Sequence, residues 1–172
     1  MTHSRRQKEA LIALPPGPPH VTHRYFEDVE PGTVEEFGSY EVTEAEIMEF
    51  AERYDPQPFH VDPEAAEESI FGGLIASGWH TAAMTMRMLV DNVVDPETTM
   101  GSPGVEELRW RVPVRPGDVL SVRQELLEKR PLESRPDAGL FRYRSETVNQ
   151  DDEVVMTLVG AGMIARREPG DG

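Results

Sequence analysis

The chain has 172 residues, of which 38% are hydrophobic, with no cysteine and a formal net charge of −15. This length and apolar content suit one globular domain with its own core, and the lack of cysteine excludes disulfides and thiolate metal sites. The negative charge argues against nucleic-acid binding, because phosphate recognition needs a basic surface. No segment resembles a signal peptide, and the longest apolar stretch, residues 74–90, is broken by polar side chains, which excludes a membrane span. We therefore expect a cytoplasmic protein.

Residues 1–22 contain a Pro-Pro-Gly-Pro-Pro run and no hydrophobic period, a pattern that predicts a flexible arm. The domain is expected to span residues 23–168, with a short flexible tail at residues 169–172.

The first elements are a predicted strand over residues 33–42 and a helix that follows it. The helix is predicted from a capping box, in which Thr43 and Glu46 would each bond the other's backbone amide, and from an apolar side chain at Ile47 and every three or four residues to Tyr54. It is expected to end in a loop that begins at Asp55. A short acidic helix is predicted to start at Asp62-Pro63 and run to residue 68.

The next element is a long helix that is apolar around most of its circumference. One helical face carries Trp79, Ala82, Ala83, Met86, Leu89 and Val90, and Met84 and Met88 widen this apolar face almost to the full circumference. Four strands are predicted downstream, over residues 105–114, 119–129, 140–150 and 153–167, with turns at residues 115–118, 134–139 and 151–152. The sequence thus predicts an α+β fold in which a meander of antiparallel strands forms a curved sheet around the long helix.

Two features carry possible chemistry. Asp55 and His60 are five residues apart, and a carboxylate beside an imidazole can hold one water molecule and move its protons. From the residues alone, the alternative that Asp55 only ends a helix and His60 is a hydrogen-bonded loop histidine is equally good. Gly78 stands where the long helix begins, so its amide could stabilise an oxygen that gains negative charge; close packing is the alternative there. Ser77 is a candidate helix cap.

The motif from Asp55 to Gly78 resembles a known family. Its parts are Asp55-x-x-Pro58-x-His60-x-Asp62-Pro63, then Phe71-Gly72-Gly73 and Ser77-Gly78. It is similar to the MaoC-like hydratases and dehydratases of the hotdog fold, which include the (R)-specific enoyl-CoA hydratases, over residues 25–167. The resemblance implies that Asp55 and His60 are the catalytic pair and that the amide of Gly78 binds the thioester oxygen. It further implies an acyl-CoA substrate, no metal or other cofactor, and a dimer with substrate tunnels at or near the subunit interface.

The chain also departs from the family pattern. Gln57 stands where many members have asparagine, Ser77 where the hydratases have histidine, Trp79 where they have methionine, and Met86 where a short-chain hydratase has serine. These positions concern the acyl pocket, so the resemblance does not identify the acyl group of the substrate.

Seven residues are candidates for contact with substrate: Gln57, Ser77, Trp79, His80, Arg109, Arg111 and Arg115. The three arginines could meet the phosphates of coenzyme A, although solvated strand arginines are common. For Trp79 the simpler reading is core or interface packing, and for His80 a buried, hydrogen-bonded side chain. A metal site made of His60, Asp62 and His80 is disfavoured, because their spacing matches no usual zinc pattern.

The sequence therefore predicts a homodimer, or a dimer of dimers, that adds water to a 2-enoyl-CoA or removes it from a 3-hydroxyacyl-CoA. A hotdog thioesterase is the first alternative; against it, residues 69–90 contain no carboxylate, which many such thioesterases carry on the central helix. A non-catalytic acyl-CoA-binding module is the second.

Overall fold

The computed structural model describes residues 23–169, so the predicted arm at residues 1–22 and most of the predicted tail lie outside the described residues. The elements are a short 3-10 helix (Phe26–Asp28), β1 (Val34–Glu41), α1 (Glu44–Tyr54), α2 (Pro58–Val61), α3 (Pro63–Glu68), α4 (Gly78–Asn92), β2 (Gly104–Trp110), β3 (Val119–Leu132), β4 (Arg135–Val148) and β5 (Val154–Ala165). The strands form one antiparallel sheet in the order β1-β3-β4-β5-β2. The α+β prediction is confirmed.

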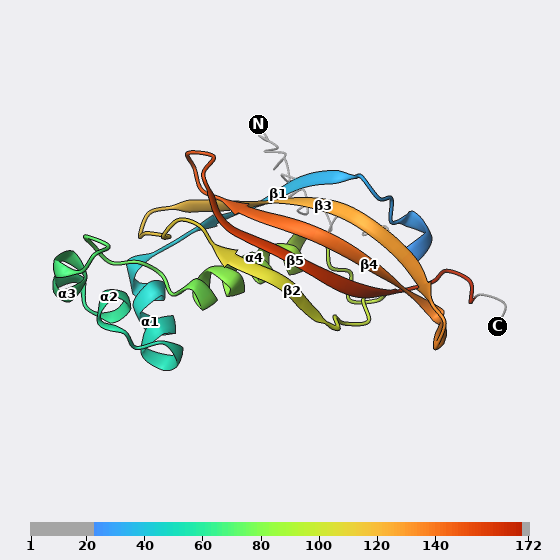
Figure 1. Ribbon diagram of the computed structural model, residues 1–172, viewed down its shortest axis with the longest axis horizontal. Coiled ribbons are helices and arrows are strands. Elements are labelled where there is room, and N and C mark those ends of the chain that lie inside the picture. The colour runs from blue at the N-terminus through green and yellow to red at the C-terminus, as the bar shows by residue number, and fades with distance from the viewer. Residues whose placement is uncertain (1–22, 170–172) are drawn as a thin grey trace, which may run out of the picture.

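The helices α1, α2 and α3 gather at one end of the molecule, beyond the end of the sheet (Figure 1). The helix α4 begins beside them and packs against β1 and β3. Its start therefore lies where the helical end meets the sheet. Within residues 23–169, no helix is both long and apolar enough to cross a membrane.

Two details of the strand prediction are wrong. The strand predicted over residues 105–114 is shorter in the structure, because β2 stops at Trp110. It pairs with β5, so only β3, β4 and β5 form a meander. Residues 135–139, predicted as a turn from their proline and glycine, belong to β4. Gly139 is needed there for packing, because a Cβ at this position would lie 2.1 Å from the ring of Phe26.

The capping box at the start of α1 is half correct. The Thr43 hydroxyl accepts a hydrogen bond from the Glu46 amide, as predicted. The Glu46 carboxylate, however, accepts a hydrogen bond from the Tyr40 hydroxyl instead of returning to the Thr43 amide. The Tyr40 hydroxyl on β1 thus takes the place that the Thr43 amide was predicted to have as the partner of Glu46.

The apolar surface predicted for α4 is buried only in part. Trp79, Met86 and Val90 are 61%, 49% and 48% exposed, whereas the buried side chains are His80, Thr81, Met84, Thr85, Met88 and Leu89. The threonines can be buried because Thr85 donates to the Thr81 carbonyl at 2.8 Å and its hydroxyl lies 2.7 Å from that of Thr147 on β4.

A glycine allows α4 to approach β1 closely. Gly38 has φ +82°, at a register shift between Phe37 and Tyr40. A Cβ at Gly38 would lie 2.6 Å from the Met88 sulfur. The bulge therefore sets the depth of α4 against the sheet.

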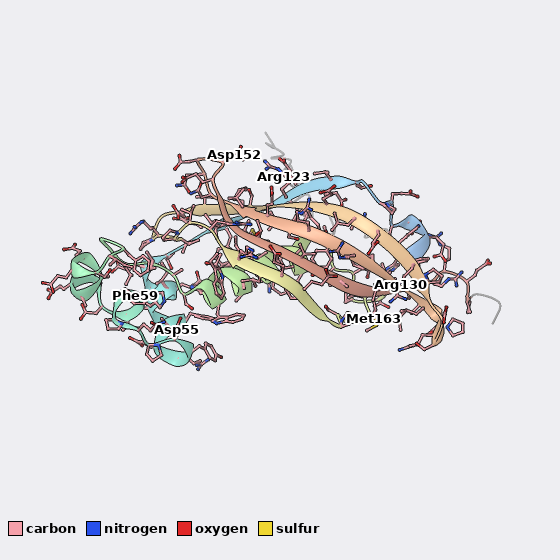
Figure 2. The ribbon with its side chains drawn as sticks, viewed as in Figure 1. Asp55, Phe59, Arg123, Arg130, Asp152 and Met163 are labelled. Carbon is pink, nitrogen blue, oxygen red and sulfur yellow. The ribbon has the colours of Figure 1, made fainter. Side chains whose placement is uncertain are left out.

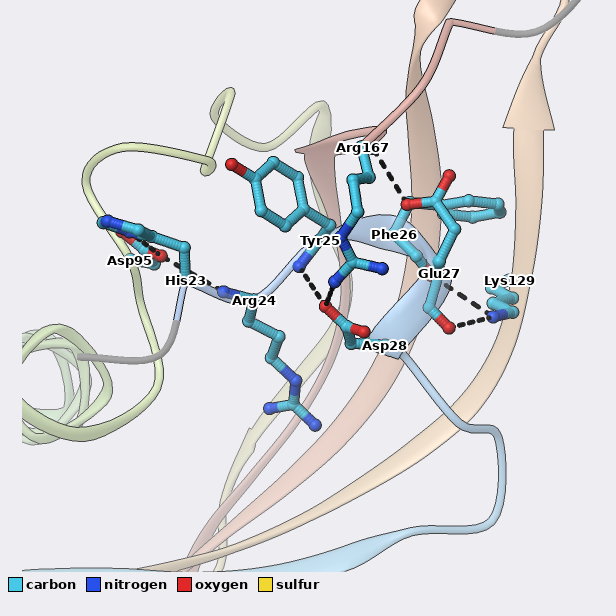
Figure 3. A network of polar contacts seen from close by, with 9 residues as sticks. All are labelled: His23, Arg24, Tyr25, Phe26, Glu27, Asp28, Asp95, Lys129 and Arg167. Carbon is cyan, nitrogen blue, oxygen red and sulfur yellow. Dashed lines mark hydrogen bonds and ion pairs between the residues drawn. The ribbon is translucent and has the colours of Figure 1, made fainter. Parts of the chain in front are cut away.

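At the other end of the sheet, polar contacts hold the first described residues (Figure 3). Asp95, in the loop after α4, is 3.0 Å from His23 Nδ1 and accepts a hydrogen bond from the Arg24 amide at 3.2 Å. Arg167, after β5, donates to Asp28 at 2.6 Å. The chain segment before β1 is thus tied to both the α4–β2 connection and the end of β5.

Candidate active site

Asp55 and His60 lie on two successive helices at the helical end of the molecule. Asp55 is the C-cap of α1, and Figure 2 shows it near Phe59 in this region. His60 is on α2, a single turn that starts at Pro58, where a loop was predicted. Proline suits the first position of a helix because it has no N–H to satisfy. The turn brings His60 back toward Asp55.

The His60 ring is buried and held in one tautomer. Its Nδ1 lies 2.7 Å from the carbonyl oxygen of Ile75. Because a carbonyl can only accept, Nδ1 carries the hydrogen, and in the neutral ring Nε2 is left as an acceptor. This Nε2 is 3.4 Å from Asp55 Oδ2.

The Asp55 carboxylate has a donor on each oxygen. Ser77 Oγ donates to Oδ2 at 2.7 Å, and Gln57 Nε2 donates to Oδ1 at 2.7 Å. The Ser77 hydroxyl, helped by the Gln57 amide and the His60 ring, holds the pKa of Asp55 below its usual range, although partial burial raises it. Asp55 is therefore ionised at neutral pH.

Gly78 is the first residue of α4, and Ser77 is its N-cap, accepting from the Trp79 amide at 3.3 Å. The amide of a first helical residue has no acceptor within its own helix. The Trp110 ring lies against Gly78: its Nε1 donates to the Gly78 carbonyl at 2.8 Å, and a Cβ on Gly78 would be 2.3 Å from the indole. Both readings of this glycine, an available amide and close packing, fit the geometry.

One cavity of about 340 Å³ has both His60 and Gly78 in its walls. The remaining wall residues are Phe59, Phe71, Ile75, Ala76, Thr81, Trp110, Arg111, Val112, Pro113 and Val114. Asp55 is not one of these wall residues, but its carboxylate lies beside the cavity, in contact with His60 and Ser77.

The aromatic walls were missed from the sequence. Phe59, Phe71 and Trp110 contribute them. A signal was present for Trp110, which is a large aromatic side chain in a strand otherwise rich in glutamate and arginine.

The seven candidate contact residues divide into groups. Gln57 and Ser77 bind Asp55, and among the three arginines only Arg111 lines the His60 cavity. Arg109 pairs with Glu107 on its own strand, and Arg115 donates to the Phe71 carbonyl at 2.6 Å.

Trp79 stays outside the cavity walls. Its ring packs edge-on against Trp110, with ring centroids 5.2 Å apart, and remains largely exposed. It extends the aromatic surface that begins at Trp110.

His80 is not brought to this cavity. It is buried, stacks on Phe50 with ring centroids 4.6 Å apart, and has Nε2 3.8 Å from Glu46. Its Nδ1 lacks a partner within the described part of the chain, contrary to the expected hydrogen-bonded histidine. Burial lowers the pKa of His80, and Glu46 only partly offsets this, so the ring is neutral at neutral pH.

Met86 lines a separate, largely apolar cavity of about 270 Å³ between the second half of α4 and strands β3, β4 and β5. Among residues 23–169, no three His, Asp or Glu side chains lie close enough together to hold a metal ion.

A curved five-stranded antiparallel sheet around a central helix is the hotdog fold, and solved structures share it. A MaoC-like dehydratase from Rhodospirillum rubrum is 43% identical, with a TM-score of 0.79 over 85% of this chain and 99% of that one. An (R)-hydratase from Pseudomonas aeruginosa is 27% identical, with a TM-score of 0.67 over 84% and 86% of the two chains.

The family model described as "MaoC like domain" matches residues 28–149. The chain therefore belongs to the MaoC-like dehydratase family. A 3-hydroxybutyryl-CoA dehydratase from Methylorubrum extorquens is 29% identical over 154 residues, which cover 89% of this chain and 92% of that protein.

Proposed function

We propose that the protein is a hydro-lyase that reversibly adds water to a 2-enoyl-CoA to give an (R)-3-hydroxyacyl-CoA. The observation that carries the proposal is the cavity that has both His60 and the start of α4 in its walls, with Asp55 3.4 Å from His60. Water would be handled at one side of that cavity and the thioester oxygen at the other.

The proposed chemistry needs hydrogen-bond acceptors that hold the water and a hydrogen-bond donor that stabilises the thioester oxygen. Asp55 Oδ2 and His60 Nε2 are both acceptors, so they can hold one water by its two hydrogens. When the water oxygen attacks the β-carbon, the thioester oxygen gains negative charge, which the Gly78 amide and the start of α4 would stabilise. The scheme uses no cofactor, since the thioester itself activates the double bond.

The cavity walls support an acyl thioester as the ligand. Phe59, Phe71 and Trp110 offer apolar surface, and Arg111 is the one arginine in the walls. We propose that Arg111 meets a phosphate of coenzyme A, since a guanidinium can bind phosphate oxygens in pairs.

Activity can be tested by mixing the protein with crotonyl-CoA and with longer 2-enoyl-CoA substrates, and following loss of the conjugated absorbance. We expect turnover by the wild type and a loss of at least about 100-fold in kcat for Asp55→Asn, because Asp55 and His60 act together as one acid–base unit and such units contribute about 10² to 10⁴ in rate. Equal rates for the two proteins would show that the pair is not catalytic. Release of free thiol without hydration would instead indicate a thioesterase.

We also propose a homodimer. Five large apolar side chains of α4 and the edge strand β2 are exposed, and two of them, Trp79 and Trp110, pack against each other. We call this set, which consists of Trp79, Met86, Val90, Val105 and Trp110, the α4/β2 patch. Large exposed apolar patches mark interaction sites, and β2 also leaves one strand edge without a partner in the sheet. A second copy of the chain would cover both.

A further inference from the structure

The Ser77 hydroxyl does not face the cavity. It is fully buried and makes two hydrogen bonds. It donates to the Asp55 carboxylate at 2.7 Å and accepts from the Trp79 amide. One hydroxyl thus connects the start of α4 to the end of α1. Since the helix start also presents the Gly78 amide, this bond fixes the two halves of the site relative to each other.

The hydrogen bonds around Asp55 favour its charged form. Ser77 and Gln57 donate to different oxygens, so a proton on either oxygen displaces one of these contacts and leaves the other to a weaker, uncharged acceptor. Asp55 is also not among the residues that line the cavity, whereas His60 is. A group with these contacts is a poor proton carrier and a good fixed anion.

His60 has the opposite arrangement. Its Nδ1–H is committed to the Ile75 carbonyl, so in the neutral ring Nε2 is an acceptor, and this ring lines the cavity. Protonation of Nε2 would place a positive imidazolium 3.4 Å from the Asp55 carboxylate, which stabilises it.

We propose that Ser77 is a positioning residue that keeps Asp55 a carboxylate throughout turnover and thereby leaves both proton transfers to His60. This inference rests on the proposed hydration. In the first step Nε2 takes a proton from water while the water oxygen bonds to the β-carbon, and the electrons of the double bond move to the thioester oxygen. In the second step the same Nε2–H proton goes to the α-carbon and the thioester carbonyl re-forms. Water is consumed, and His60 and Asp55 return to their starting states.

The first test does not depend on activity. The side-chain carboxyl of Asp55 is followed by ¹³C NMR during an acid titration and is assigned by its absence in Asp55→Asn. The usual pKa of an aspartate side chain is about 3.9. We expect the Asp55 midpoint to lie below this value in the wild type and to be higher in Ser77→Ala than in the wild type. The control is Thr43→Ala, which removes the cap of α1 at the end away from Asp55 and should leave the midpoint unchanged. An unchanged midpoint in Ser77→Ala overturns the proposal.

The second test uses kinetics with an enoyl-CoA substrate. We expect Ser77→Ala to lower kcat about tenfold with KM within twofold of wild type, because a positioning residue does not touch the substrate. A tenfold rise in KM at unchanged kcat would mean that Ser77 binds the substrate, and would overturn the proposal.

The roles of the pair are compared in the same assay. His60→Gln should lose at least tenfold more activity than Asp55→Asn, because it removes the proton carrier itself. The reverse order would assign the proton to Asp55 and overturn the proposal. If no enoyl-CoA is turned over by wild type, the proposed function fails, while the NMR titration still decides whether Ser77 controls the ionisation of Asp55.

Discussion

Among single residues, the contact between Gly78 and Trp110 decides which side chain can stand at the start of α4. The backbone of Gly78 is helical, so an alanine there meets no conformational penalty, but its Cβ would be 2.3 Å from the indole ring. The need for glycine is therefore steric and comes from a residue 32 positions away in the chain.

We expect Gly78→Ala to lower the free energy of unfolding by about 1 to 3 kcal/mol, the usual cost of overpacking. In a Trp110→Leu background the same change should cost much less, because the ring that it displaces is gone. Urea denaturation of the four proteins in a double-mutant cycle measures this coupling. Equal costs in the two backgrounds would show that Trp110 does not crowd Gly78.

Residue patterns predicted part of the site. The spacing of Asp55 and His60 and the position of Ser77-Gly78 are visible in the sequence, and the structure brings these residues together. The bond from Ser77 to Asp55 was not predictable, because the cap signal of a serine is local, whereas its second partner lies 22 residues earlier on another helix. The contact between Trp110 and Gly78 was not predictable for the same reason.

At the scale of elements, the segment before β1 is held by a buried carboxylate. Asp95 accepts hydrogen bonds from the Glu97 and Arg24 amides and contacts His23. Burial raises the pKa of Asp95, but these bonds outweigh it, so the pKa of the carboxyl in the folded protein is below its usual value.

We expect Asp95→Asn to lower the free energy of unfolding by about 1 kcal/mol at pH 7, since it weakens hydrogen bonds to a charged acceptor. The pKa of Asp95 is lower in the folded protein than in the unfolded chain, where it is about 4. The extra stability of the wild type over Asp95→Asn is therefore fully present above about pH 4. It is lost as the pH falls through the lower folded-state pKa. Denaturation midpoints of both proteins between pH 7 and pH 3 measure this.

The control for that experiment is Asp137→Asn. Asp137 pairs with Arg135 but is exposed, so solvent screens the pair. Its replacement should change stability much less than Asp95→Asn. A constant difference between wild type and Asp95→Asn down to pH 3 would contradict the role given to the Asp95 charge.

At the scale of the whole molecule, the α4/β2 patch and the net charge of −15 would oppose each other in the proposed dimer. The apolar patch favours association, whereas two chains of like charge repel. Since the Debye length falls from about 30 Å at 0.01 M salt to about 8 Å at 0.15 M, we expect the dimer to strengthen with salt over that range.

Met86→Glu should convert the dimer into a monomer, because it places a charge in the α4/β2 patch without entering the folded core. Sedimentation equilibrium at several salt concentrations measures the mass. The matched control is Ile70→Glu, which changes a side chain that is 95% exposed and lies outside the patch. A dimer of unchanged affinity in Met86→Glu would place the interface elsewhere.

The sequence by itself determined the order of the helices and most strands, the capped start of α1, the α+β class and the pairing of Asp55 with His60 in one motif. These features depend on local periodicity, caps and turns, which neighbouring residues carry. Only the tertiary structure decided which face of α4 is buried, which partner Glu46 takes, and that Ser77 and Trp110 complete the surroundings of Asp55 and Gly78. An apolar helix surface looks alike whether its own sheet or a second molecule covers it, and contacts between residues far apart in the chain leave no local pattern.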